Sequence, residues 1–148
     1  MQKVLLFILL YSALLSIGHT QNSIVGYLPS YRSYNPEQMT FLTDLILFSA
    51  EPNADAGLTI SPALKKLLKE VSEKKIKGKR YFLCVGGWGR SKHFSAICQN
   101  DLKRQQFIKS VQTVLKTYGL DGVDYDWEHP TNKSEKDCLL YTSPSPRD

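Results

Sequence analysis

The chain has 148 residues, a length that limits it to about one ordinary domain. Its composition is 42% hydrophobic and 22% charged, without internal repeats, which is typical of a globular protein and excludes a repeat array. The formal net charge of +5 is mildly basic, and residues 65–80 (KKLLKEVSEKKIKGKR) hold most of the excess. A nucleic-acid-binding patch is one interpretation of that run. The solvated face of a helix is the better one, so we expect no nucleic-acid partner.

The first twenty residues differ from the rest of the chain. Lys3 provides a positive start, and the apolar run VLLFILLYSALLSI that follows has about the length of a signal-peptide core. Small residues allow cleavage after Gly18 or after Thr20. A membrane anchor is the alternative, but the run is short for a bilayer span of about 20 residues. Residues 1–20 are therefore predicted to be a signal peptide, and the mature protein to be secreted, extracellular and free of the membrane.

Short apolar strands alternate with helices over the following residues. This alternation predicts a parallel sheet covered by helices, either an open doubly wound sheet or a (β/α)8 barrel. The segment GGWG at residues 86–89 lacks the GxGxxG order of a nucleotide-binding loop, so no cofactor is expected. Strands are expected in SIVGY (23–27), DLILFSA (44–50), RYFLCVGGW (80–88) and LDGVDYDW (120–127), and a brief helix in PEQMTFL (36–42).

Two longer helices carry start and stop signals. Ser61 is the expected N-cap of the first, with Pro62 at its first position and Gly78 at its end. Asn100 or Asp101 caps the second. The expected buried faces comprise Leu64, Leu67, Leu68 and Val71 in the first helix, and Phe107, Ile108, Val111, Leu115 and Tyr118 in the second, which Gly119 stops.

The segment DGVDYDWE, residues 121–128, places four carboxylic acids in a short stretch. Side chains alternate along a strand, so Asp124, Asp126 and Glu128 share one face at spacings of about 6.5–7 Å, and the apolar residues between them take the other. At an effective dielectric of about 20, two full charges at that distance repel by about 2.5 kcal/mol. We therefore expect the row to share protons, with the acid at the strand end kept protonated as a general acid. A calcium loop or a solvated acidic turn is disfavoured by the aromatic residues between the acids.

These acids belong to a pattern that resembles a known family. DGVDYDWE is similar to the DGxDxDxE signature of family 18 glycoside hydrolases, the chitinases, with every acid in place. CVGGW (84–88) resembles the family's SxGGW motif on the preceding strand, and IVGY (24–27) its first strand. The resemblance runs from about Ser23 to Pro130 and departs from the pattern at Cys84, where the family usually has Ser. It implies an α/β fold, the first half (about strands one to four) of a (β/α)8 TIM barrel.

The resemblance also implies cleavage of β-1,4 bonds between N-acetylglucosamine units, with chitin or chito-oligosaccharides as partners and a monomeric protein. Glu128 would protonate the glycosidic oxygen while the substrate's 2-acetamido carbonyl attacks the anomeric carbon, giving an oxazolinium intermediate. Asp126 would orient the acetamide and stabilise its positive charge, and Asp124 would exchange a proton with Asp126. Glu128 would then act as base on water, with retention of configuration.

Other positions match the family pattern or lie beside it. Tyr27 and Trp88, at the ends of the first and third strands, match positions where aromatic rings contact sugars, although such rings also serve as core. Gly86 and Gly87 would let the backbone pass close to the substrate. Asp121 precedes the strand and breaks the parity of the other acids, so its expected role is structural.

The remaining polar motifs leave alternatives open. Secretion permits a disulfide between Cys84 and Cys98, but two buried free thiols fit equally well, and spacing does not decide between them. Asn132 in NKS is an N-glycosylation sequon. The histidines lack metal-ligand spacing, so no metal is expected. His129 directly follows the predicted acid Glu128, and it can shape the adjacent subsite or be an ordinary loop residue.

The segment CLLYTSPSPRD, residues 138–148, resembles the in-frame translation of a transposase adapter used to prepare sequencing libraries. We expect native sequence to end near Asp137, so that residues 21–137 are the N-terminal half of a catalytic domain and residues 138–148 an artefact. The family's second half includes a tyrosine that assists the acetamide and a tryptophan under the cleaved sugar. Four strands cannot close a barrel and would leave two exposed sheet edges, so the chain alone is expected to be inactive and poorly folded.

Two alternatives to a secreted chitinase stay open. A non-catalytic chitinase-like lectin or growth factor would bind chito-oligosaccharides on the same barrel, but such lectins usually lose the acid that Glu128 provides. An endo-β-N-acetylglucosaminidase acting on N-glycans is also compatible with the first half of a barrel.

Overall fold

A computed structural model describes residues 22–142, and the predicted signal peptide lies outside the described residues. Four parallel strands form one sheet in the order β1-β2-β4-β5, so all four predicted strands are present. A two-residue strand, β3, pairs antiparallel with the end of β2. The strands are β1 (Val25–Pro29), β2 (Asp44–Pro52), β3 (Leu58–Thr59), β4 (Arg80–Gly86) and β5 (Gly122–Asp126).

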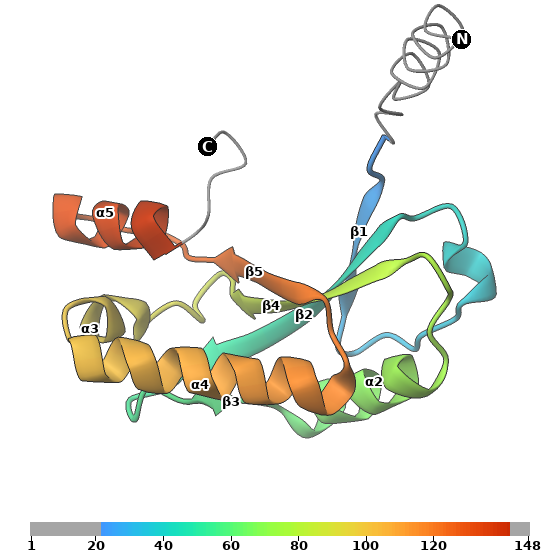
Figure 1. Ribbon diagram of the computed structural model, residues 1–148, viewed down its shortest axis with the longest axis horizontal. Helices are drawn as coiled ribbons and strands as arrows, with labels where there is room; N and C mark the ends of the chain where they lie inside the picture. Colours follow the sequence, from blue (N-terminus) through green and yellow to red (C-terminus); the bar gives the residue numbers. More distant parts are fainter. Residues whose placement is uncertain (1–21, 143–148) are drawn as a thin grey trace, which may run out of the picture.

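The two long helices, α2 and α4, cover one face of this sheet and leave the other bare (Figure 1). Parallel strands that follow chain order, with their helices on one side, form the wall of a barrel, whereas a doubly wound sheet reverses its order and carries helices on both faces. The chain therefore forms the first half of a (β/α)8 barrel, as predicted. The helices are η1 (Glu37–Met39), α2 (Pro62–Glu73), α3 (Phe94–Cys98), α4 (Asp101–Tyr118) and α5 (Lys133–Thr142). None of the helices within residues 22–142 is long and apolar enough to cross a membrane.

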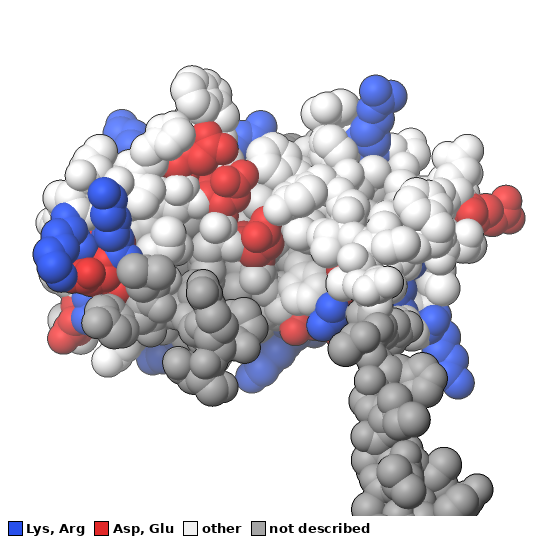
Figure 2. Space-filling view, turned by 90° about the horizontal axis from the view of Figure 1, so that it is seen from above, with Lys and Arg blue, Asp and Glu red and all other residues white. Residues whose placement is uncertain are grey.

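The hydrophobic core lies between the sheet and helices α2 and α4. Alternate side chains of each strand enter it, and the intervening side chains project from the bare face, which Figure 2 shows. The fully buried core side chains include Leu45 and Leu47 of β2, Leu64, Leu67, Leu68 and Val71 of α2, and Tyr81, Leu83 and Val85 of β4. All four predicted core positions of α2 are thus confirmed.

Helix α2 begins where the sequence predicts and ends earlier. The Ser61 hydroxyl accepts a hydrogen bond from the Leu64 N–H at 3.1 Å, so the predicted N-cap is confirmed. The helix ends at Glu73, not near Gly78. The backbone N–H of Ile76 donates to the Tyr81 hydroxyl at 2.8 Å, which satisfies it outside the helical pattern.

Helix α4 confirms its caps but not its whole predicted buried face. Asn100 accepts from the Lys103 N–H at 3.0 Å, and Gly119 ends the helix in a left-handed conformation (φ 63°). Ile108 was a wrong prediction, because it is 43% exposed, and Val114 is buried in its place. The buried stripe follows positions 107, 111 and 114, and a residue next to 107 points about 100° away from it.

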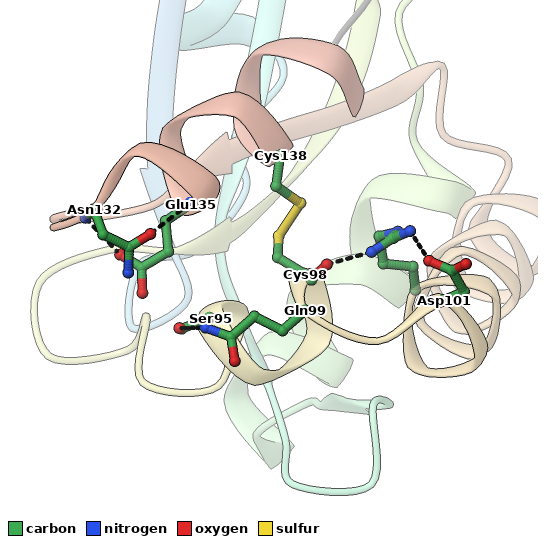
Figure 3. The surroundings of a disulfide bond; sticks show 8 residues. Ser95, Cys98, Gln99, Asp101, Asn132, Glu135 and Cys138 are labelled. Carbon is green, nitrogen blue, oxygen red and sulfur yellow. Dashed lines mark hydrogen bonds and ion pairs between the residues drawn. A yellow bond between two sulfur atoms is a disulfide. The ribbon is translucent and has the colours of Figure 1, made fainter.

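The structure pairs Cys98 with Cys138 in a disulfide between α3 and α5, with a Cα–Cα distance of 5.9 Å (Figure 3). Cys84 is a buried free thiol. A Cys84–Cys98 pairing is therefore wrong, because Cys84 projects from the bare face of β4 and Cys98 ends a helix on the opposite side of the sheet. That native sequence ends near Asp137 stays a prediction.

A polar cluster at the start of β2 gives the fold a defined dependence on pH. The Asp44 carboxylate accepts hydrogen bonds from the Arg80 guanidinium and from the hydroxyls of Thr43 and Ser23. The hydrogen bond from Arg80 is the main cause that lowers the pKa of Asp44 to about 2, from an ordinary value of 3.8. Because the folded pKa lies below the unfolded one, the interaction stabilises the fold above about pH 4 and is lost as the pH falls toward 2.

Asp44→Asn should therefore lower the free energy of unfolding by about 1 kcal/mol at neutral pH, a modest loss because the Arg80 side chain is largely exposed to solvent. The difference from the parent should shrink between about pH 5 and about pH 2.5. Urea denaturation of the full-length protein at both pH values measures it. An equal difference at the two pH values would contradict the assignment.

Candidate active site

A row of acidic side chains occupies the bare face where β5 ends. Asp124 and Asp126 project from this face of the strand, with Glu128 two residues further on, while the residues between them pack against the core. The predicted alternation of side chains is therefore present. Figure 2 shows acidic side chains in a short row among uncharged ones on the face opposite α2 and α4. The Glu128 side chain is 32% exposed, so it is open to a ligand while partly enclosed by protein.

Tyr27 joins the inner end of this row. Its hydroxyl donates to Asp124 Oδ2 at 2.9 Å, across a sequence separation of 97 residues. Burial of the hydroxyl, together with this hydrogen bond, raises the pKa of Tyr27 to about 12, so it remains a donor throughout the neutral range. The ring is 55% exposed. The sequence predicted contact between this ring and sugar, which stays a prediction, and it did not predict the hydrogen bond that joins Tyr27 to the acid row.

Cys84 lies directly beneath the acids. It is opposite Asp124 in the register of β4 and β5, and it is completely buried. Burial, with the nearby charges of Asp124 and Asp126, raises the pKa of the Cys84 thiol well above its usual range. The side chain is therefore a neutral S–H group at neutral pH, hydrogen-bonded to Asp124. Cysteine at this position keeps a proton donor where the related motif has a serine hydroxyl.

The glycine pair after β4 is explained by close contacts within the protein. Gly86 has φ 109°, and a Cβ atom there would lie 2.2 Å from the backbone oxygen of Asp126. Gly87 has φ 102°, and a Cβ atom there would lie 2.7 Å from the Phe48 ring. The Gly87 N–H donates to the same Asp126 oxygen at 2.7 Å. Glycine is thus required for β4 to approach the acid row, and the predicted contact of both glycines with substrate stays a prediction.

Aromatic and imidazole rings lie beside Glu128 at the rim. Trp88 is 79% exposed, and its ring meets that of His129 edge to face, with centroids 5.8 Å apart. His129 Nε2 lies 4.0 Å from Glu128 Oε2. Both interpretations of His129, as a residue that shapes the adjacent subsite and as an ordinary loop residue, stay open. The exposed Trp88 ring is not part of the core.

Asp121 stands apart from the row. Its carboxylate accepts the Tyr81 N–H at 2.7 Å, and its own N–H donates to the Tyr81 oxygen at 2.8 Å. Both contacts join the start of β5 to β4, which agrees with a structural role. Within residues 22–142, no group of three His, Cys, Asp or Glu side chains could hold a metal ion.

The predicted sequon lies at the start of α5. Asn132 is exposed, and its side-chain oxygen accepts the Glu135 N–H at 2.9 Å (Figure 3). Glu135 in turn accepts from the N–H of Asn132 at 3.3 Å, a reciprocal capping arrangement. Hydrogen bonds, led by that from Ser95, lower the pKa of Glu135 to about 2. Glycosylation of the exposed Asn132 stays a prediction.

Sequence reasoning missed Ser91, which lies in the loop between β4 and α3. Its buried hydroxyl contacts backbone groups of Gly87, Asp126 and Glu128. A serine among the polar residues that follow GGW carries no local pattern that would have distinguished it.

Comparisons with known proteins point to one family. The family model "Glycosyl hydrolases family 18" matches residues 23–143. The chain is 30% identical over 138 residues to "Probable chitinase 2" of Drosophila melanogaster, covering 76% of this chain and 28% of that protein. It is 40% identical over 70 residues to an endochitinase of Manduca sexta, covering 42% of this chain and 12% of that protein.

Solved structures show the same relationship. A class V chitinase from Nicotiana tobaccum, crystallised as a Glu→Gln mutant with NAG4, superposes with a TM-score of 0.72 at 25% identity, over 80% of this chain and 36% of that one. A chitinase from Rhizomucor miehei superposes with a TM-score of 0.68 at 25% identity, over 81% of this chain and 35% of that one. The chain spans little more than a quarter of the curated relative from Drosophila and about a third of the solved structures. The chain belongs to family 18 of the glycosyl hydrolases.

Proposed function

We propose that the full-length protein carrying this chain is a chitinase that hydrolyses β-1,4 bonds between N-acetylglucosamine units. The observation that carries the proposal is the row of Asp124, Asp126 and Glu128, aligned on the inner face of a half-barrel with the last acid open to solvent. Family membership and relatives named chitinases support the same reaction. The protein binds chitin or its oligosaccharides, needs no cofactor and acts as a monomer.

The proposed mechanism uses the substrate as nucleophile. Glu128 protonates the leaving glycosidic oxygen, and the 2-acetamido carbonyl attacks the anomeric carbon to form an oxazolinium ion. Asp126 orients the acetamide and stabilises its positive charge, while Asp124 exchanges a proton with Asp126. Water then opens the oxazolinium ion, and Glu128 accepts the proton of that water, with retention of configuration. The hydrogen bond from Tyr27 to Asp124 supports the role given to Asp124, because it fixes the position of this innermost acid beside Asp126.

Residues 21–137 alone are proposed to be inactive. In the described part of the chain, β1 and β5 each pair with a single parallel neighbour, and the face that carries the acids has no opposing barrel wall. Exposed Val25 and Tyr27 on that face need the remaining strands to cover them. The complete protein is further proposed to be secreted after removal of residues 1–20 and to carry an N-glycan on Asn132.

Chromatography of the products formed from N-acetylglucosamine hexamers tests the proposal. The full-length protein should release shorter oligomers whose new reducing ends are initially the β-anomer, because retention preserves the configuration of the cleaved bond. Binding of the hexamer without turnover would instead identify a lectin. Turnover of a high-mannose glycopeptide alone would identify an endo-β-N-acetylglucosaminidase. Hydrolysis of the hexamer by residues 21–137 would contradict the proposed need for the second half.

A further inference from the structure

Ser91 joins the loop after β4 to the acid row through three contacts. Its Oγ accepts the backbone N–H of Glu128 at 3.1 Å. The same hydroxyl lies 3.1 Å from the backbone oxygen of Asp126 and 3.3 Å from that of Gly87, and its single proton can be donated to either. The side chain is only 7% exposed, so it lies beneath the site and away from solvent.

These contacts act where the sheet no longer controls the backbone. Strand β5 ends at Asp126, so the ladder of hydrogen bonds with β4 does not extend to Glu128. Beyond the end of the strand, the Ser91 hydroxyl binds the backbone instead. It accepts the Glu128 N–H and lies within hydrogen-bond distance of the backbone oxygen of Asp126, the last strand residue. The position of the Glu128 backbone therefore depends on one buried side chain from another loop.

The loop that carries Ser91 is itself anchored on its other side. The guanidinium of Arg90 donates to the Ser49 hydroxyl at 3.1 Å and lies 3.5 Å from Glu51 Oε1, both on β2. It also lies over the Phe48 ring, 5.5 Å from the centroid. Arg90 thus contacts β2, and its neighbour Ser91 contacts the end of β5. The contacts of Arg90 fix the loop, so Ser91 is held in place beside the backbone of Glu128.

We propose that Ser91 is a positioning residue for the acid Glu128: it sets the backbone from which the carboxyl group reaches the glycosidic oxygen. This inference rests on the proposed chitinase function. Proton transfer requires the carboxyl group within hydrogen-bond reach of the oxygen, and a displacement of about 1 Å can cost up to about 100-fold in rate. Ser91 is too deeply buried to bind the substrate, so its loss should affect the chemical step more than binding.

The test compares two leaving groups in the full-length protein. A sugar leaving group must be protonated as it departs, whereas 4-nitrophenolate is stable as an anion and needs little help from an acid. Ser91→Ala should lower kcat on N-acetylglucosamine hexamers by roughly 10-fold, with KM changed less than about twofold. On 4-nitrophenyl chitobioside the loss should be only about twofold. Ser91→Thr, which keeps the hydroxyl, should recover most of the hexamer activity.

Ser110→Ala is the matched control for lost stability. The Ser110 hydroxyl on α4 accepts the Leu58 N–H of β3 at 3.2 Å, so its removal costs a comparable hydrogen bond to a backbone N–H without touching Glu128. This variant should keep the parent kcat on both substrates. The positioning role would be overturned if Ser91→Ala lost kcat equally on the two substrates or lost none on either. It would also be overturned if Ser91→Thr did not recover the hexamer activity. A parent protein that cleaves neither substrate would instead overturn the proposed function.

Discussion

Glu128→Gln should lower kcat for hydrolysis of N-acetylglucosamine hexamers by at least about 1,000-fold while leaving their affinity within about threefold of the parent. Glutamine keeps the shape of the side chain and its capacity to accept a hydrogen bond. It can neither give a proton to the leaving oxygen nor take one from water, so both halves of the proposed mechanism are blocked. Product analysis measures the rate, and calorimetric titration at a temperature that suppresses turnover measures the affinity.

Glu70→Gln provides the control for a generic loss of negative charge. Glu70 lies on α2, where it pairs with Lys66 at 3.9 Å on the helix side of the sheet, so this variant should turn over substrate like the parent. A second readout comes from 4-nitrophenyl chitobioside, on which Glu128→Gln should lose less activity than on the hexamer. Full hexamer turnover by Glu128→Gln would contradict the assignment of the acid.

The sequence predicted best what depends on neighbouring residues. The acid row lies within one strand, so the alternation of side chains was enough to place Asp124, Asp126 and Glu128 on one face. Caps such as Ser61 and Asn100 involve bonds that span only three residues, and both were predicted correctly for the same reason. The order of apolar strands and helices along the chain predicted a parallel sheet covered by helices, and the resemblance to family 18 implied that this sheet is half of a barrel.

Contacts between distant segments could not be predicted in this way. Tyr27 reaches Asp124 across 97 residues and Ser91 reaches Glu128 across 37, and no local pattern encodes either contact. The burial of Ile108 was predicted wrongly for a related reason. Several sets of apolar positions on α4 can form one helical stripe, and only packing against the sheet selects the set that is buried. The separation of Cys84 on β4 from Cys98 at the end of α3 is likewise a property of the fold that spacing along the chain does not encode.

Gly86→Ala is expected to have the largest effect on folding of any substitution in the motif CVGGW. The backbone at Gly86 has φ 109°, a region that is almost exclusive to glycine. A methyl group there would lie 2.2 Å from the Asp126 oxygen and 3.0 Å from the Phe94 ring. The oxygen belongs to the backbone of β5, so it cannot rotate away, and relief requires β4 and the acid row to separate. We expect a loss of about 3 kcal/mol or more in stability, with a sharp fall in kcat for the protein that still folds.

Two other alanine substitutions separate this clash from the cost of a positive φ. Gly78→Ala shares the constraint, with φ 84°, but a methyl group there meets nothing within 4 Å, so it should cost about 1 kcal/mol and leave kcat unchanged. Gly87→Ala would meet the Phe48 ring at 2.7 Å, and because a side chain can move where a backbone cannot, its cost should be intermediate. Thermal unfolding of the full-length variants should therefore rank Gly86→Ala below Gly87→Ala and Gly87→Ala below Gly78→Ala. If Gly86→Ala and Gly78→Ala were equally stable, the close contact with Asp126 would not be the reason for glycine at position 86. The position of the acid row would then not depend on that glycine.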